Sequence, residues 1–258
     1  MNLQVLVATM NQNDHSLLNK MNIQSDAIIG NQSNRNEVEE FKYNGHKIKY
    51  LSFAERGVGL NRNNTLMRAD ADICLFADDD VVYCDNYKEL VLSAFAQNPD
   101  ADLIAFNVKS SNQDRVGFVE SKKQRIRFYN FMRHGTYRLA IRLKTIRKEN
   151  IYFSLLFGGG AKYSCGEDTL FLLECLRSRL VMYSVPICIG EVKQIESTWF
   201  DGYTDKYFKD KGVLFAAISR KLAWLLSIQF VIRKYKLFRG DIKPGRALKL
   251  MFDGIRQY

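Results

Sequence analysis

Three consecutive aspartates, Asp78, Asp79 and Asp80, directly follow the apolar run at residues 73–77. Carboxylates packed together at the end of a buried strand repel one another, and a hard divalent cation relieves that repulsion through oxygen ligands. The segment is therefore a candidate Mg²⁺ or Mn²⁺ site. The alternative is a solvated acidic turn, and the preceding strand argues against it because it fixes the acids at the edge of a sheet where ligands bind.

A second acidic pair, Glu167 and Asp168, follows the glycine-rich stretch at 157–160 and precedes an apolar helical pattern over 169–176. A glycine-rich loop lets a substrate approach the backbone, and a carboxylate beside it can act as a general base. A structural alternative stays open, because Ser164 and Glu167 have the spacing of a capping box and acids favour helix N-termini.

A third pattern begins at Gly57 and Gly59, which permit a tight entry into a helix. Arg62 and Asn63 are then expected in the first helical turn, where an anionic phosphate binds favourably. The alternative for Arg62 is an ordinary surface arginine.

The elements that must position these groups alternate along the chain. Apolar runs predict strands over residues 3–8, 27–29, 48–53, 73–77, 103–108 and 181–189. Helical patterns follow Gly59 and cover residues 87–96. This alternation is typical of a parallel α/β sheet, whose ligands lie beyond the carboxyl ends of the strands. Thr9 and Asn11, Asn31 and the three aspartates all fall at such strand ends.

The composition fits a globular protein, with 258 residues of which 47% are hydrophobic. Five cysteines without a CxxC pair argue against a zinc site or a disulfide framework and favour the reducing cytoplasm. The first residues lack the basic region and cleavage site of a signal peptide.

The net charge of +10 is unevenly distributed. Residues 122–148 hold ten lysines and arginines and no acid, residues 220–258 carry a net +8, and the remainder carries a net −8. Two basic segments on an acidic body indicate that both face something anionic. No nucleic-acid recognition motif is present, so nucleic acid is not the expected partner.

Both basic segments have helical patterns. In residues 122–149, apolar residues recur at helical spacing and Arg127, Arg138 and Arg142 would share one face, which predicts a basic helical insertion. In the tail, the uncharged run at 222–232 is too short to span a bilayer. With Trp224 and basic flanks it predicts an interfacial helix on an anionic membrane. The alternative is a helix that packs on the core with a solvated basic end.

Three stretches, in order over roughly residues 1–200, resemble glycosyltransferase family 2, inverting enzymes with the GT-A fold. Residues 7–11 resemble the family's Pro-Thr-Tyr-Asn opening. Residues 57–80 resemble its Gly-x-x-x-Arg-Asn and Asp-x-Asp segment, and residues 157–172 resemble its Gly-Gly loop, Glu-Asp pair and following helix. The resemblance implies a metal-dependent transfer from a nucleotide-diphosphate-sugar, with Mg²⁺ or Mn²⁺ as cofactor.

The resemblance also implies roles for single residues. Asp78 and Asp80 would hold the metal, Asp168 would be the catalytic base, and Glu167 would lie beside it on the acceptor side. The implied donor contacts are Thr9, Asn11, Asn31, Arg62, Asp78 and Asp79. The implied acceptor side also includes Gly159, Gly160 and Trp199. Two positions depart from the family pattern: Asn31 stands where an acid usually reads uracil, and residues 194–199 lack the expected histidine.

These observations predict a GT-A catalytic domain over 1–211, with an insertion at 122–149, and a basic helical tail over 212–258. The expected activity is inverting transfer of a sugar, from a UDP-sugar in the first instance, to a lipid-linked or polysaccharide acceptor at the inner face of the plasma membrane. A nucleotidyltransferase is disfavoured because the N-terminus lacks a glycine-rich loop with arginine and lysine. A non-catalytic protein that binds a membrane or nucleic acid on a transferase-like fold stays an alternative. The sequence leaves the sugar, the nucleotide and the linkage open.

Overall fold

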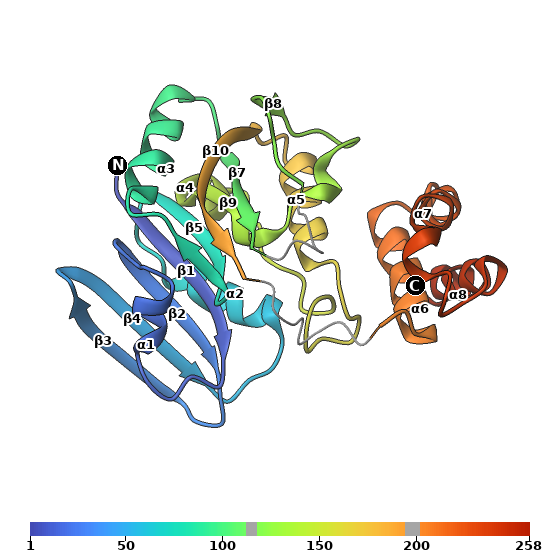
Figure 1. Ribbon diagram of the computed structural model, residues 1–258, viewed down its shortest axis with the longest axis horizontal. Coiled ribbons are helices and arrows are strands. Elements are labelled where there is room, and N and C mark those ends of the chain that lie inside the picture. The colour runs from blue at the N-terminus through green and yellow to red at the C-terminus, as the bar shows by residue number, and fades with distance from the viewer. Residues whose placement is uncertain (112–117, 194–201) are drawn as a thin grey trace.

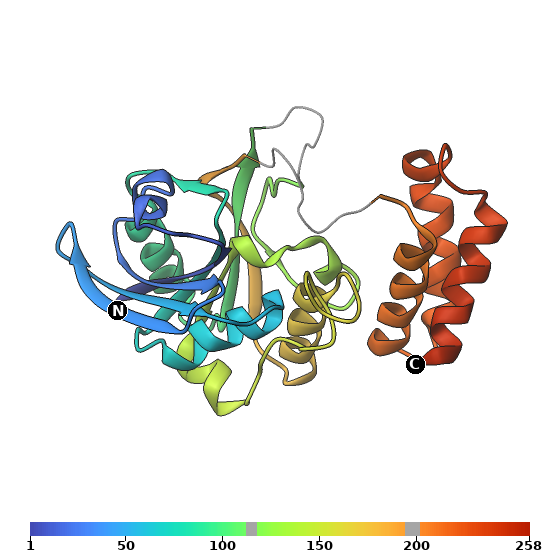
Figure 2. The same cartoon turned by 90° about the horizontal axis from the view of Figure 1, so that it is seen from below.

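A computed structural model describes residues 1–111, 118–193 and 202–258. One central sheet is flanked by helices, and three C-terminal helices form a separate group beside it (Figures 1 and 2). The strands are β1 (Leu3–Met10), β2 (Asp26–Gln32), β3 (Glu37–Tyr43), β4 (His46–Phe53), β5 (Ile73–Asp78), β6 (Val81–Tyr83), β7 (Leu103–Ser110), β8 (Gln124–Arg125), β9 (Leu139–Arg142) and β10 (Met182–Val192). The helices are α1 (Ser16–Lys20), α2 (Val58–Arg68), α3 (Tyr87–Gln97), α4 (Leu143–Lys148), α5 (Glu167–Arg177), α6 (Asp205–Ile218), α7 (Ala223–Phe238) and α8 (Pro244–Gln257), with 3₁₀ turns η2 (Phe131–Arg133) and η3 (Thr136–Arg138).

The sheet has the strand order β3-β4-β2-β1-β5-β9-β7-β10-β6, with β8 paired to β10. Strands β4, β2, β1 and β5 run parallel, so their carboxyl ends meet at one edge. The register pairs Ala8 with Asp78 and Thr9 with Asn31. The prediction that the polar strand ends gather at one edge is therefore confirmed.

Apolar side chains fill both faces of this sheet. On one face Phe76 of β5 makes edge contacts with Phe153 and Phe171, whose rings stack on each other at 4.3 Å. Because β5 is buried over its whole length before Asp78, the aspartates begin where the core ends. The six strands predicted from the sequence are all present, and β3 is an additional edge strand.

The prediction of a helical insertion over 122–149 is wrong. The segment contains β8, two 3₁₀ turns and β9, and only its last part is the helix α4. Leu139–Arg142 forms a strand that runs antiparallel between β5 and β7. Leu139, Ala140 and Ile141 are fully buried on alternating faces, so burial in the middle of a sheet overrides the helical spacing.

The three C-terminal helices share their own apolar core, built from Phe208 and Phe215 of α6, Phe238 of α7 and Met251 of α8 among others. Helices α6 and α8 approach closely because Gly212 and Gly254 carry no side chain; a Cβ on either would lie within about 2 Å of a backbone oxygen of the other helix. The predicted boundary between the catalytic domain and the tail, at residue 212, lies inside α6. This helix begins at Asp205, and the side chain of Thr204 caps its N-terminus. No helix among the described residues is long and apolar enough to cross a membrane.

Candidate active site

The three aspartates occupy the end of β5 and the turn that follows it. The Thr9 hydroxyl at the end of β1 donates to Asp79 Oδ2 at 2.5 Å, and Gln12 Nε2 donates to the same hydroxyl at 3.0 Å. Burial raises the pKa of Asp79 and the neighbouring Asp78 raises it further, while the Thr9 hydrogen bond lowers it. The two strand ends are thus joined through side chains as well as through the sheet.

Arg62 of α2 joins the two acidic segments. Its Nη2 donates to Asp78 Oδ1 at 2.6 Å and its Nη1 donates to Glu167 Oε1 at 2.8 Å, across 105 residues of sequence. The side chain is only 5% exposed, and its guanidinium carbon lies 5.5 Å from the centre of the Phe153 ring. Burial alone would lower the pKa of Arg62, but the carboxylates of Asp78 and Glu167 raise it above its usual value.

This arrangement corrects two sequence expectations. Helix α2 begins at Val58, so Arg62 and Asn63 lie in the second turn instead of the first, and Arg62 is buried instead of exposed at the surface. Asn63 makes two hydrogen bonds with the backbone of Phe153, at 2.8 and 2.9 Å. The second turn of α2 therefore holds the acidic segments in place, and whether Arg62 also contacts a donor stays a prediction.

The glycine-rich loop packs against the same cluster. Gly158 has a φ of 109°, and a Cβ there would lie 2.9 Å from Glu167 Cδ and 2.8 Å from a methyl group of Val58. The amide of Val58 donates to the Gly159 carbonyl at 2.9 Å, and Gly160 is exposed. Only glycine allows this approach, so the loop and Glu167 are positioned together.

Asp168 lies in the first turn of α5, whose N-cap is Gly166 with a φ of 115° and no capping side chain. The capping-box alternative is therefore wrong; the amide of Ser164 instead donates to Asp210 Oδ2 at 2.9 Å. Burial and the charge of Glu167 raise the pKa of Asp168 to about 6, against the Thr169 amide, Arg62 and Lys211, which lower it. A carboxylate with this pKa suits a general base near neutral pH.

The polar residues at the ends of β1 and β2 hold the backbone there. Asn31 is fully buried; its Nδ2 donates to the Gln12 carbonyl and to Ser52 Oγ, each at 3.0 Å, and its Oδ1 accepts from the Gln12 amide at 3.0 Å. Asn11 is exposed with a φ of 56°. The amide of Asn31 is thus used within the protein, while Asn11 presents its side chain at the sheet edge.

Two residues that sequence reasoning missed face the acids. Burial raises the pKa of Tyr137, and Asp78, Asp80 and Asp168 raise it further, so the phenol of η3 lies in the field of both acidic segments. Lys211 of α6 contacts Asp168 electrostatically and donates to Cys165 Sγ at 3.4 Å. Tyr137 lies in the basic segment that the charge pattern had selected, whereas no sequence signal separates Lys211 from the other tail cations.

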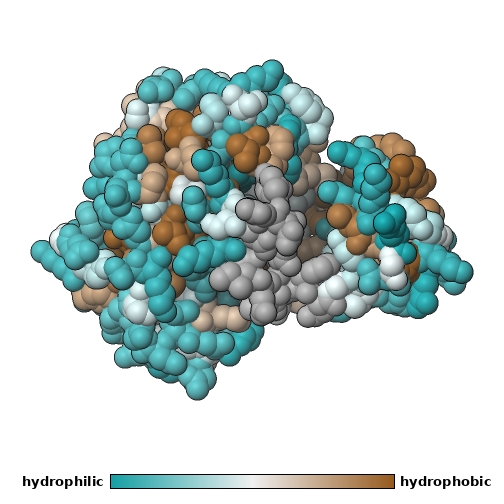
Figure 3. All heavy atoms as spheres, in the orientation of Figure 1, coloured by the Kyte–Doolittle hydropathy of each residue, from teal (hydrophilic) through white to brown (hydrophobic). Residues whose placement is uncertain are grey.

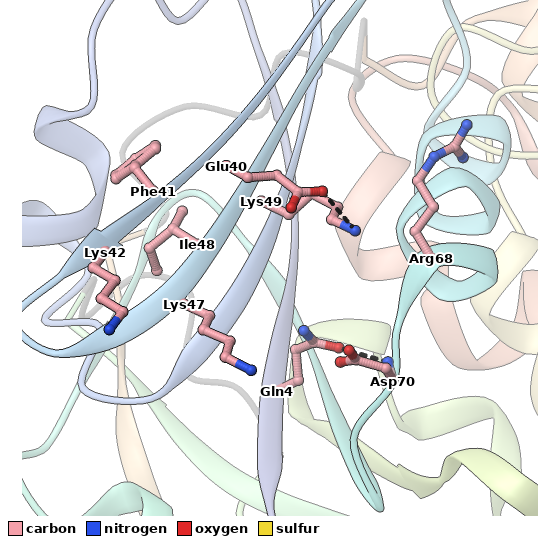
Figure 4. Close-up of a pocket in the computed structure, with 9 residues that line it drawn as sticks. All are labelled: Gln4, Glu40, Phe41, Lys42, Lys47, Ile48, Lys49, Arg68 and Asp70. Carbon is pink, nitrogen blue, oxygen red and sulfur yellow. Dashed lines mark hydrogen bonds and ion pairs between the residues drawn. The ribbon is translucent and has the colours of Figure 1, made fainter.

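A hollow of about 410 Å³ lies away from these groups (Figure 4). It is lined by Gln4, Glu40, Phe41, Lys42, Lys47, Ile48, Lys49, Arg68 and Asp70. Gln4 and Ile48 stand near the amino ends of their strands, and Asp70 precedes β5. The hollow therefore opens at the end of the parallel strands opposite to the aspartates, which is not where ligands of such sheets bind.

No group of three His, Cys, Asp or Glu side chains among the described residues is arranged to hold a metal. Asp78 and Asp80 flank one turn, and the Asp78 side chain is 38% exposed although its Oδ1 accepts from Arg62. Mg²⁺ is commonly held by one or two carboxylates together with substrate phosphates. The donor set therefore fits a metal that binds with a diphosphate better than one that is caged by the protein alone.

The chain is similar to known proteins in part of its sequence and in its fold. The family model named "Glycosyl transferase family 2" matches residues 28–152. The match covers just under half of the chain, and these residues are similar to glycosyltransferase family 2. They include Arg62 and all three aspartates, whereas Thr9, Glu167 and Asp168 lie outside the match. No curated protein sequence matches the chain.

Solved structures of S. aureus TarS share the fold of this chain. The structure of TarS 1–349 in complex with UDP-GlcNAc has a TM-score of 0.67 at 15% identity and covers 94% of this chain and 76% of that one. The complex of TarS 1–349 with UDP has a TM-score of 0.63 at 16% identity. A longer TarS structure has a TM-score of 0.64, and the match covers 46% of its chain. The predicted GT-A fold is confirmed; Trp199 lies outside the described residues.

Proposed function

We propose that the protein transfers a sugar from a nucleotide-diphosphate-sugar to an acceptor hydroxyl, with a UDP-sugar as the first donor to test. The observation that carries the proposal is the Arg62 bridge between Asp78 and Glu167, at 2.6 and 2.8 Å. It brings the aspartates proposed to hold the metal close to the Glu-Asp pair proposed to supply the general base. The UDP-GlcNAc and UDP complexes of TarS support this class of donor.

In this proposal Asp168 accepts the proton of the acceptor hydroxyl. The freed oxygen attacks the anomeric carbon as the bond to the diphosphate oxygen breaks, and the nucleoside diphosphate departs with the bonding electrons. A single displacement from the side opposite the leaving group inverts the anomeric centre. A pKa of about 6 leaves the carboxylate of Asp168 ionised near neutral pH and still basic enough to assist. Gly159 and Gly160 would border the acceptor.

Asp78 and Asp80 would hold Mg²⁺ or Mn²⁺ together with the donor's diphosphate. The metal would supply positive charge to the departing diphosphate. Thr9, Asn11, Asn31 and Asp79 stand at the neighbouring strand ends and would shape the nucleotide pocket. Arg62 adds a fixed positive charge behind Asp78 and holds this carboxylate in place through the hydrogen bond to its Oδ1.

For the acceptor we propose a lipid-linked or polysaccharide glycan, and for the location the cytoplasmic face of the plasma membrane. The support is the helical unit, which consists of α6, α7 and α8. It carries a net positive charge and packs against the N-cap of α5, the helix that begins with Glu167 and Asp168. Leu214 of α6 packs so closely on Gly166 that a Cβ there would lie 2.5 Å from it. An acceptor held at a membrane would thus be presented beside Asp168.

The decisive experiment replaces Asp168 by asparagine. We expect Asp168→Asn to reduce sugar transfer roughly 10²- to 10⁴-fold, the usual contribution of a positioned base, while donor affinity changes little. Product release from a panel of nucleotide-sugars and calorimetric binding of UDP would be measured side by side. Equal loss of binding and turnover would show that Asp168 is structural and would contradict the proposal.

The metal assignment is tested by Asp80→Asn, which removes a charge but little volume. We expect UDP binding to lose its dependence on Mn²⁺ while the thermal unfolding midpoint stays close to that of the parent. The matched control is Asp85→Asn, on the turn before α3 and away from the cluster. Unchanged Mn²⁺-dependent binding in Asp80→Asn would rule out the metal role.

A further inference from the structure

Helix α7 is buried on one side only. Val231 and Phe238 point into the core shared with α6 and α8. The opposite side, here called the outer face of α7, consists of Leu225, Ile228, Ile232 and Tyr235. These side chains are 63%, 40%, 73% and 39% exposed. Steps of three, four and three residues place them on one stripe along the helix.

A continuous apolar stripe of this kind marks an interaction surface, because soluble proteins rarely leave such surfaces bare. In Figure 3 hydrophobic residues appear as brown spheres over the part of the helical unit where Figure 1 labels α7. Trp224 adjoins the stripe, and its ring packs against Phe252 of α8 at 4.6 Å. The indole is therefore held at the edge of the apolar surface.

Exposed cations lie at both ends of α7. They are Lys221, Arg233, Lys234, Lys236 and Arg239. Within the described parts of the chain, none of these five forms a salt bridge, in contrast to Arg246 and Arg256 of α8, which pair with Asp205 and Asp253. Asp241 is the single acid between residues 220 and 252. The surface therefore combines exposed apolar side chains with uncompensated positive charge.

We propose that the outer face of α7 docks on an anionic lipid surface. The helix has 16 residues, or about 24 Å at 1.5 Å per residue, and lies in the plane of the interface. Its apolar stripe enters the boundary between headgroups and acyl chains, and the surrounding cations meet anionic headgroups. A second copy of the chain fits less well, because a two-fold contact through this face brings the cations of both copies together.

Packed side chains connect α7 with the first turn of α5, which carries Glu167 and Asp168. Phe230 of α7 contacts Phe215 of α6 at 6.0 Å, and Lys211 Nζ lies 5.8 Å from the centre of the Phe230 ring. Lys211 in turn acts on Asp168 electrostatically. This inference rests on the membrane location proposed above, but lipid docking does not depend on sugar transfer, so docking and transfer can fail separately.

The test is flotation of the full chain with phosphatidylcholine vesicles that contain or lack phosphatidylglycerol. We expect binding to the anionic vesicles and release at high salt. A Leu225→Ser, Ile232→Ser double variant should bind roughly tenfold or more weakly, because apolar insertion and charge attraction act together. The matched control is Val38→Ser, Met67→Ser, which removes two exposed apolar side chains elsewhere; Val38 is 55% and Met67 50% exposed. Arg233→Gln with Lys236→Gln should also weaken binding by roughly tenfold and reduce its salt dependence.

Circular dichroism and UDP binding verify that each variant is folded. The proposal is overturned if the parent fails to float with anionic vesicles, if the double serine variant floats as well as its control, or if both vesicle types bind equally. It is also overturned if light scattering shows a dimer that the double serine variant abolishes while vesicle binding is absent, since the face then joins two copies. Loss of UDP binding in the parent would contradict the proposed function and leave the flotation result intact.

Discussion

The two basic segments have the same sign of charge and use it in opposite ways. In residues 122–148, Arg138 is buried and donates to the Phe118 carbonyl, and Arg142 donates to carbonyls of the α3 end and the loop after it. On α7 the cations are exposed around an apolar face. The numbers of lysines and arginines alone gave no reason to distinguish the two segments. The difference is that the first contributes a strand to the middle of the sheet, where Arg138 and Arg142 donate to backbone carbonyls.

The largest difference between a buried and an exposed cation is expected at Arg62, which lies outside both basic segments and is buried between two carboxylates. Arg62→Met should reduce the free energy of unfolding by about 3–5 kcal/mol, because Glu167, whose side chain is only 14% exposed, is left without its partner. Arg233→Met on α7 should change it by less than about 0.5 kcal/mol. Urea unfolding of both variants measures the contrast. Adding Glu167→Gln to Arg62→Met should restore part of the loss, and no restoration would contradict the ion-pair explanation.

A smaller effect is expected at Arg142, whose Nε donates to the Ala101 carbonyl at 2.7 Å and whose guanidinium lies 5.1 Å from the Phe95 ring. Arg142→Met should cost about 1–3 kcal/mol of unfolding free energy, because a carbonyl loses its donor. Lys236→Met should cost close to nothing. If the two variants have the same urea midpoint, the distinction between cations that donate to backbone carbonyls and exposed cations is wrong.

The smallest and sharpest effect concerns Lys211, a cation of the helical unit that faces the acids. With the pKa of Asp168 at about 6, kcat/KM should fall about tenfold for each pH unit below that value, because the base becomes protonated. Lys211 lowers this pKa, so Lys211→Met should move the acidic limb to higher pH. Lys236→Met should leave the pH profile in place. An unshifted pH profile in Lys211→Met would show that Lys211 of α6 does not act on Asp168.

Much of the fold could be predicted because buried strands are continuous apolar runs, as in β1 and β5. The edge strand β3 was not predicted, because its side chains are exposed or only partly buried and form no continuous apolar run. A local signal was present: Asn44 and Gly45, with φ of 48° and 83°, form the tight turn that joins β3 to β4. The strand β9 had no such signal, since four residues in the middle of a sheet can have either periodicity.

By itself the sequence determined which residues stand at the sheet edge. A buried run such as 73–77 must end where polar residues begin, and parallel strands bring such ends together. Only the tertiary structure decided how these groups act on one another. The Arg62 bridge joins residues up to 105 positions apart, and the pKa of Asp168 depends on burial and on Glu167, Arg62 and Lys211. Such effects depend on the distances between groups and on their burial from water, and the sequence alone specifies neither.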